Sequence, residues 1–104
     1  MAIKTTRWNA AELLETREDA AAYIAAAMED GDPQLIAAAI GDVAKAMGMS
    51  KLAKETGLSR ENLYRSLSHD GNPEFATVVR VLNALGIRLE PKLTEEPGRE
   101  NEIA

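Results

Sequence analysis

The sequence contains no cysteine, only four aromatic residues and no long apolar run. Without cysteine the chain can form neither a disulfide framework nor a metal site built on thiolates. The scarcity of aromatic residues, together with abundant alanine, leucine, isoleucine and valine, favours packed helices over a β-sandwich or barrel. No stretch approaches the roughly 18 apolar residues that span a membrane, and the first residues lack the apolar core of a signal peptide. We therefore expect a cytoplasmic protein that makes no membrane contact.

A chain of 104 residues is long enough for one domain with a single modest core. The first dozen residues are weakly patterned, although Asn9 could cap a short turn there, and the end of the chain is polar and acidic. We expect an N-terminal arm over residues 1–15 and a folded domain, including its dimerisation element, over residues 16–93. Residues 94–104 are expected to form a disordered acidic tail.

The net charge of −5 is unevenly distributed along the chain. Residues 1–44 carry three basic and eight acidic side chains, and residues 90–104 carry two basic and five acidic ones. Between them, residues 45–89 carry seven basic and four acidic side chains. Nucleic acids attract positive surfaces, so the middle of the chain is the part suited to DNA. The acidic N-terminal third suits a basic partner, or it is simply a set of solvated helix faces.

Helical periodicity and capping residues predict about five helices in an all-α fold. The expected helices, each with its capping residue in parentheses, are 17–30 (Thr16), 33–47 (Asp32), 51–56 (Ser50), 60–67 (Ser59) and 73–85 (Asn72). Pro33 and Pro73 stand at first helical positions, where proline is well accepted. From Ile87 to Leu93 apolar residues alternate with charged ones, which predicts a short C-terminal β-strand.

Two of these helices carry apolar faces that we expect in the core. On residues 33–47 the face runs from Leu35 to Met47. Gly41 lies within it and indicates a close helix crossing, because glycine costs about 1 kcal/mol relative to alanine inside a helix. On the last helix the expected core face is Phe75, Val79 and Leu82, and Val78, Val81 and Leu85 widen the apolar stripe beyond it.

Residues 49–68 have the spacing of a helix-turn-helix. Ala53 is small where a second helix must approach, Gly57 follows four residues later at the turn, and Leu63 follows after six more. Leucines 52, 58 and 63 are spaced to lie beneath the two short helices. Ser66 stands where the pattern usually has another aliphatic residue, and Leu67 comes one position later. Since Leu63 and Leu67 still share a face, we interpret the departure as a small rotation of the second helix.

In a helix-turn-helix the second helix enters the major groove of double-stranded DNA. Arg60 is the first candidate for reading a base, because its guanidinium can form two hydrogen bonds with guanine, and Asn62 could read adenine. Lysines 51 and 54 and Ser50 suit phosphate contacts. Ser59, at the helix start, could present backbone N–H groups to a phosphate. The expected DNA-contacting set is Ser50, Lys51, Lys54, Ser59, Arg60, Glu61, Asn62, Tyr64, Arg65 and Ser68.

Two members of this set have a second interpretation. Tyr64 could reach a base or the DNA backbone, or it could cover the next helix. Glu61 has the wrong charge for phosphates, so it either pairs with Arg65 four residues later or selects against some bases.

Signals of catalysis are missing from the sequence. It has no nucleophile–base pair, glycine-rich phosphate loop or metal-ligand spacing, so we expect neither an enzyme nor a bound cofactor. The single histidine, His69, lies beside Asp70 in a turn cluster and is interpreted as a turn residue. The acidic residues near position 30 are interpreted as a solvated helix end.

Residues 23–93 resemble the HigA-like addiction-module antidote proteins. The resemblance is carried by the EDGDP turn, the run IGDVAKAMGMSKLAKETGLSRENLYRSLS, the GNPEFATV start and the ALGIRL ending. It implies a lambda-repressor-like helical core and a homodimer. It also implies two activities. The first is neutralising a small basic toxin of the RelE or HigB type, which is an RNA-cleaving enzyme that acts with the ribosome. The second is repressing the shared operon by binding operator DNA.

The helix expected over residues 17–30 is the candidate toxin contact, because its charge is opposite to that of the DNA face. Its candidate residues are Glu18, Asp19, Tyr23 and Glu29. The candidate dimer contacts lie on the last helix and on the strand after it, where an unpaired strand edge would pair with its copy. They are Val78, Val81, Leu85, Ile87 and Leu89. Pairing of the strand with the arm near residues 3–8 would instead leave a monomer.

Two other functions remain open from the sequence. One is a stand-alone helix-turn-helix transcriptional regulator. The other is a protein-interaction module that uses the turn only for packing and does not bind DNA.

Overall fold

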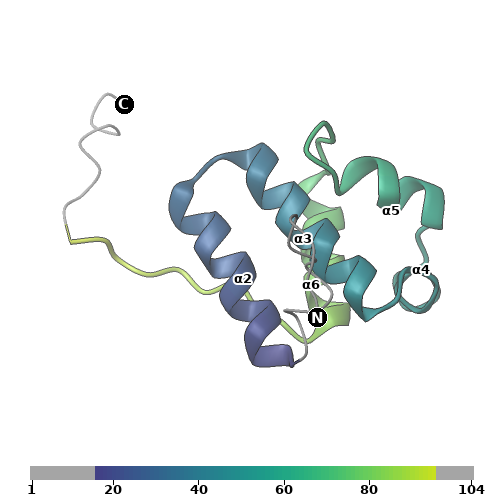
Figure 1. Ribbon diagram of the computed structural model, residues 1–104, viewed down its shortest axis with the longest axis horizontal. Helices are drawn as coiled ribbons and strands as arrows, with labels where there is room; N and C mark the ends of the chain where they lie inside the picture. The colour runs from purple at the N-terminus through teal and green to yellow at the C-terminus, as the bar shows by residue number, and fades with distance from the viewer. Residues whose placement is uncertain (1–15, 96–104) are drawn as a thin grey trace, which may run out of the picture.

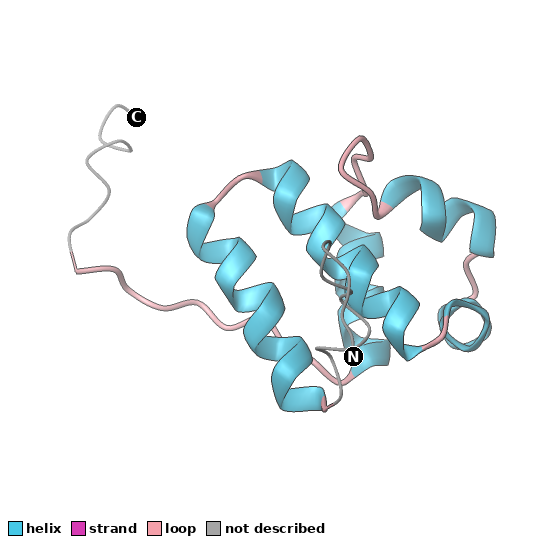
Figure 2. Ribbon diagram, viewed as in Figure 1, coloured by secondary structure: helices cyan, strands magenta, loops and turns pink. Residues whose placement is uncertain are grey.

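The computed structural model describes residues 16–95, and within them the chain is all-α, as predicted (Figures 1 and 2). Five helices lie in these residues, matching the expected number: α2 (Arg17–Asp30), α3 (Pro33–Met47), α4 (Met49–Thr56), α5 (Arg60–Ser66) and α6 (Phe75–Leu85). The predicted arm over residues 1–15 and most of the predicted tail lie outside the described residues. No helix within residues 16–95 is long and apolar enough to cross a membrane.

Three helices begin directly after the capping residue that the sequence predicts. The Thr16 hydroxyl accepts from the Asp19 N–H at 3.0 Å, and the Asp32 carboxylate accepts from the Gln34 N–H at 2.9 Å. The Ser59 hydroxyl accepts from the Asn62 N–H at 3.0 Å, which fixes the start of α5. Each cap satisfies a backbone N–H that has no partner in the first helical turn.

Two predicted caps are wrong. Helix α4 starts at Met49 with Gly48 as its cap, so Ser50 lies inside the first turn and caps nothing. Helix α6 starts at Phe75, two residues after Pro73, with Glu74 as a cap that makes no side-chain hydrogen bond. At both positions a plausible capping residue stands near the helix but not at its boundary.

Helix α3 is the centre of the bundle. In Figure 1, α2 lies along one side of α3 and α4 and α5 lie on the other side, and packing contacts join α3 to each of these helices and to α6. The buried core comes from all five helices: Ala20, Ile24, Ile40, Val43, Ala44, Met49, Leu52, Leu63, Leu67, Val81, Leu82 and Leu85. The two ends of the stripe predicted on α3, Leu35 and Met47, are exposed instead.

The close crossing predicted at Gly41 is present. A Cβ atom at this position would overlap the carbonyl oxygen of Leu67, the residue that ends α5. Leu63 and Leu67 are both buried, which confirms that they share the inner face of α5 despite Ser66. The glycine therefore lets the end of α5 rest directly on α3.

The strand predicted at Ile87–Leu93 is not formed. Figure 2 shows the chain after α6 as loop, and no strand occurs anywhere in residues 16–95. A β-strand is defined by hydrogen bonds to a neighbouring strand, and this part of the chain offers none. The alternating pattern alone could not supply that neighbour.

Candidate nucleic-acid interface

Helices α4 and α5 are joined by a short turn whose geometry depends on two residues. Gly57 ends α4 with φ of 79°, a left-handed conformation that glycine adopts without strain. The hydroxyl of the buried Thr56 donates to the Leu52 carbonyl at 2.8 Å and accepts from the Leu58 N–H at 3.2 Å. Sequence reasoning missed Thr56, although a threonine beside a turn glycine is a recognisable signal for such side-chain bonds to the backbone.

The inner face of this unit agrees with the predicted spacing. Leu52 and Leu63 are buried in the core, and Ala53 and Leu58 are partly buried against it. Four side chains of α5 are exposed, as a helix that enters a DNA groove requires: Arg60, Glu61, Tyr64 and Arg65.

The predicted DNA contacts lie together on the outer surface of α4 and α5. The residues classed as exposed are Ser50, Lys51, Lys54, Ser59, Arg60, Glu61, Tyr64 and Arg65. Asn62 is half-buried and lines a polar groove of about 310 Å³ with Ser66 and Arg80. Ser68 is also half-buried and lies beyond the end of α5, so it does not belong to the outer face of the helix.

The positive charges of this surface are not neutralised within the described chain. Among residues 16–95, Arg88 is the one lysine or arginine with an ion-pair partner, Glu90 at 3.0 Å. Glu61 and Arg65 form no ion pair there, so the first interpretation of Glu61 is not realised in this structure. The side chains of Lys45, Lys51, Lys54, Arg60 and Arg65 are exposed and accessible to a partner.

Aromatic contacts order part of the surface. The guanidinium carbon of Arg60 lies 5.5 Å from the centre of the Tyr64 ring, and the Lys45 Nζ lies 5.9 Å from it. Tyr64 is 43% exposed, so part of its side chain is accessible to a partner. Lys45 comes from α3, outside the helix-turn-helix stretch, and was missed by the sequence analysis.

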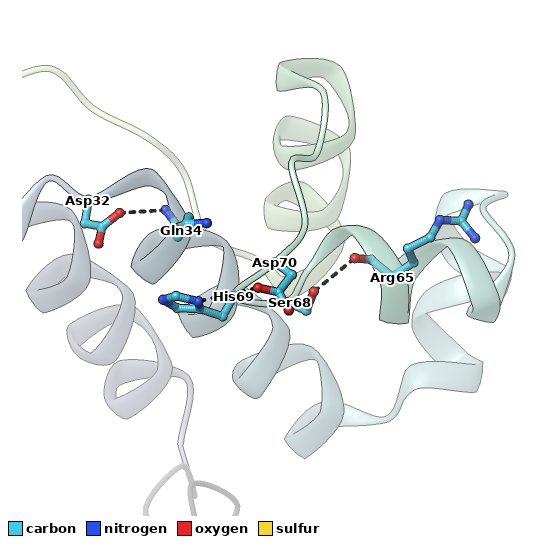
Figure 3. Close-up of polar contacts among 6 residues, drawn as sticks. All are labelled: Asp32, Gln34, Arg65, Ser68, His69 and Asp70. Carbon is cyan, nitrogen blue, oxygen red and sulfur yellow. Dashed lines mark hydrogen bonds and ion pairs between the residues drawn. The ribbon is translucent and has the colours of Figure 1, made fainter.

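The turn after α5 is built from short polar contacts (Figure 3). The Ser68 hydroxyl donates to the Arg65 carbonyl at 3.0 Å, and the Arg65 side chain points away from the turn. His69 and Asp70 pair at 3.9 Å while both remain largely exposed, which agrees with the interpretation of His69 as a turn residue. Residues 16–95 contain no cluster of side chains that could hold a metal ion.

The candidate toxin contacts lie on α2, away from α4 and α5. Glu18, Asp19 and Glu29 are exposed, while Tyr23 is half-buried and its hydroxyl donates to Asp42 Oδ2 at 2.6 Å. Burial raises the pKa of the Tyr23 hydroxyl well above its ordinary value, and the hydrogen bond to Asp42 and the charge of that carboxylate add to the effect. An apolar groove of about 300 Å³ opens between α2 and α3, lined by Tyr23, Ala26, Ala27, Leu35, Ala38, Ala39 and Asp42.

The candidate dimer contacts on α6 need correction. Val81 is fully buried and Leu85 is 7% exposed, because the inner face of α6 passes through these residues and Leu82. Phe75, expected in the core, is 73% exposed. Val78 and Ile87 are half-buried and Leu89 is exposed, so only part of the predicted set is available to a second copy.

Residues 4–93 match the family model described as probable addiction module antidote protein. The chain belongs to this family of antidote proteins. A relative from Haemophilus influenzae, called an uncharacterized protein, is 40% identical over 83 residues, which cover 80% of this chain and 86% of the relative. No solved structure matches the antidote chain. An antidote acts on a toxin, so membership of the family makes this chain an antitoxin with a toxin as its partner.

Proposed function

We propose that the antitoxin is HigA-like, that it neutralises a toxin of the RelE or HigB type, and that it represses its own operon by binding operator DNA. Membership of the antidote family supports the neutralisation of a toxin. The observation that carries operator binding is the group of exposed cations without ion-pair partners on α4 and α5, the two short helices joined at Gly57. Such a surface attracts phosphates and presents an arginine to the edges of the bases.

The DNA contact divides into two classes of residue. Lys51 and Lys54 on α4 bind phosphates and set the register of the protein on the duplex. Arg60, in the first turn of α5, enters the major groove and bonds a guanine. The outer face of α5 is held at a fixed angle by the burial of Leu63 and Leu67, so these two classes of contact act together. This arrangement is a lambda-repressor-like helix-turn-helix.

The toxin contact lies on α2, on the other side of α3. From Arg17 to Ala44 the chain carries one basic and six acidic residues, and the acids at both ends of α2 are exposed. A toxin that holds RNA presents positive charge, and complementary charge speeds association and sets specificity. The groove between α2 and α3 adds apolar surface beside these acids. Because DNA and toxin meet opposite sides of α3, one molecule can hold both.

Co-expression with the product of the adjacent gene tests toxin neutralisation, which requires that this gene encode a small basic protein. We expect the antitoxin to restore growth when that protein is induced, and the two proteins to co-purify. A stand-alone regulator would bind DNA without restoring growth. A protein-interaction module that lacks DNA binding would not shift a DNA duplex in an electrophoretic assay.

An electrophoretic shift assay with a duplex from the promoter of the antitoxin gene tests the second activity. Arg60→Ala should weaken specific binding by about 1–3 kcal/mol and relax the preference at one base pair. Lys51→Ala should weaken binding to every duplex alike and reduce its dependence on salt. If Arg60→Ala reduced specific and unspecific binding equally, Arg60 would be a phosphate contact only.

A further inference from the structure

Tyr64 lies beside two positive charges that come from different helices. Arg60 precedes it by one turn on α5, and its guanidinium carbon lies 5.5 Å from the ring centre. Lys45, in the last turn of α3, places its Nζ 5.9 Å from the same centre. Both distances fall within the roughly 6 Å at which a cation is attracted to the face of an aromatic ring. The ring therefore gathers two cations at one edge of the α4–α5 surface.

The ring restrains these cations without neutralising them. A carboxylate partner would cancel the charge of Arg60 and occupy its N–H donors, whereas an aromatic face leaves both for another ligand. Within residues 16–95 neither Lys45 nor Arg60 forms an ion pair. Lys45 also lies at the negative end of the α3 dipole, which favours a positive charge at this position.

We infer that Lys45 is a DNA-backbone contact and that Tyr64 is a positioning residue that orients Arg60 toward a base. This inference rests on the proposed DNA binding and deepens it. The lysine ammonium is a flexible point charge, which suits a phosphate, while the planar guanidinium gains specificity only if its orientation is fixed. The DNA-binding surface thus extends from α4 and α5 onto the end of α3.

Binding of two duplexes over a series of salt concentrations tests this inference. One duplex carries the promoter region of the antitoxin gene, and the other has the same length and an unrelated sequence. Lys45→Gln should weaken binding to both by the same factor and lower the slope of log affinity against log salt by about 0.9, the value for one lost phosphate contact. Arg17→Gln, at an exposed position on α2 on the other side of α3, is the control that removes one positive charge elsewhere, and it should leave the slope unchanged.

Tyr64 is tested by the ratio of the two affinities. Tyr64→Phe keeps the ring and should keep the ratio. Tyr64→Leu removes the ring and should lower the ratio about two- to five-fold, the factor that corresponds to an exposed cation–π contact. Thermal unfolding of each variant confirms that the exposed substitutions leave the fold intact.

Three outcomes would overturn the inference. An unchanged salt slope for Lys45→Gln would remove Lys45 from the DNA surface. An equal loss of specificity in Tyr64→Phe and Tyr64→Leu would show that the hydroxyl, not the ring, is the active group. Absence of DNA binding by the unmodified chain would overturn the proposed DNA binding itself and this inference with it.

Discussion

The backbone of Leu67 lies so close to Gly41 that no side chain fits between them. Leu67 ends α5, and Gly41 lies in the middle of α3, so this contact fixes the position of α5 on the bundle. Gly41→Ala should raise helix propensity yet lower the free energy of unfolding by about 1–3 kcal/mol, the usual cost of overpacking. Urea unfolding measures the change, and the outward shift of α5 should also weaken DNA binding.

Gln34→Ala provides the control for Gly41→Ala, since it changes helix propensity in the same helix at an exposed position. Its unfolding free energy should stay within about 0.5 kcal/mol of the unmodified protein. A Gly41→Ala variant more stable than the unmodified chain would contradict the close contact.

The hydrogen bond from Tyr23 to Asp42 predicts a loss of stability at alkaline pH. The pKa of the Tyr23 hydroxyl is raised in the folded state, so as pH rises past about 10 the unfolded chain loses this proton first. The contribution of Tyr23 is therefore present below about pH 10 and is lost above it. Tyr23→Phe should be less stable than the unmodified protein at neutral pH by about 1 kcal/mol, and the difference should shrink as pH rises above about 10.

Urea unfolding at each pH measures this effect, with Tyr64→Phe as the matched removal of an exposed tyrosine hydroxyl. The Tyr64→Phe curve should run parallel to that of the unmodified protein. If the Tyr23→Phe curve also ran parallel to it, the Tyr23–Asp42 contact would not control the ionisation of Tyr23.

Local signals predicted most of the helix boundaries. The caps at Thr16, Asp32 and Ser59 act on N–H groups within three residues, so their effect can be read from a short stretch of sequence. The contacts of Gly41 with Leu67 and of Lys45 with Tyr64 join residues about 20 or more positions apart. Only the folded chain brings such residues together.

The sequence of α6 does not determine which of its faces is buried. Its sequence, FATVVRVLNAL, has apolar residues on most of its circumference, so periodicity cannot choose between a core face with Phe75 and one with Val81. Val81 is buried because α6 packs on α3 and α4 through its later turns. The strand at residues 87–93 depends in a similar way on a partner that the sequence pattern does not contain.

Reversing the charges of α2 should weaken toxin binding without affecting DNA. The double variant Glu18→Lys with Glu29→Lys changes exposed positions and leaves the buried residues of α2 in place. Deleting residues 1–31 would instead strip Ala20, Ile24 and Ala27 from the core. We expect association with the toxin to slow by about ten-fold or more at low salt and growth rescue to fail.

Two measurements check this prediction. Stopped-flow or surface-capture kinetics give the association rate, and the promoter-duplex shift assay should show unchanged DNA affinity. Asp70→Lys with Glu95→Lys is the control with the same change in net charge at exposed positions outside α2. Equal slowing by both double variants would mean that overall charge, and not α2, governs the association.

The antitoxin should be a homodimer whose contact includes Phe75 and the segment after α6. One helix-turn-helix reads only half of a palindrome, and two copies place their recognition helices about 34 Å apart. Phe75 is 73% exposed and Leu93 is 99% exposed, and the backbone of residues 87–93 has no strand partner in the described part of its own chain. Pairing of this segment with its copy would satisfy both the apolar side chains and the strand edge.

The substitutions that test the dimer must avoid the core. Val81→Glu would bury a charge at a fully buried position and unfold the protein, so it cannot report on the dimer. Phe75→Ser with Leu89→Lys changes exposed positions and should give a folded monomer with greatly weakened operator affinity. Sedimentation velocity at micromolar concentration measures the change, and circular dichroism confirms the fold. If the unmodified protein sediments as a monomer at that concentration and still binds a palindrome tightly, operator recognition does not depend on this contact.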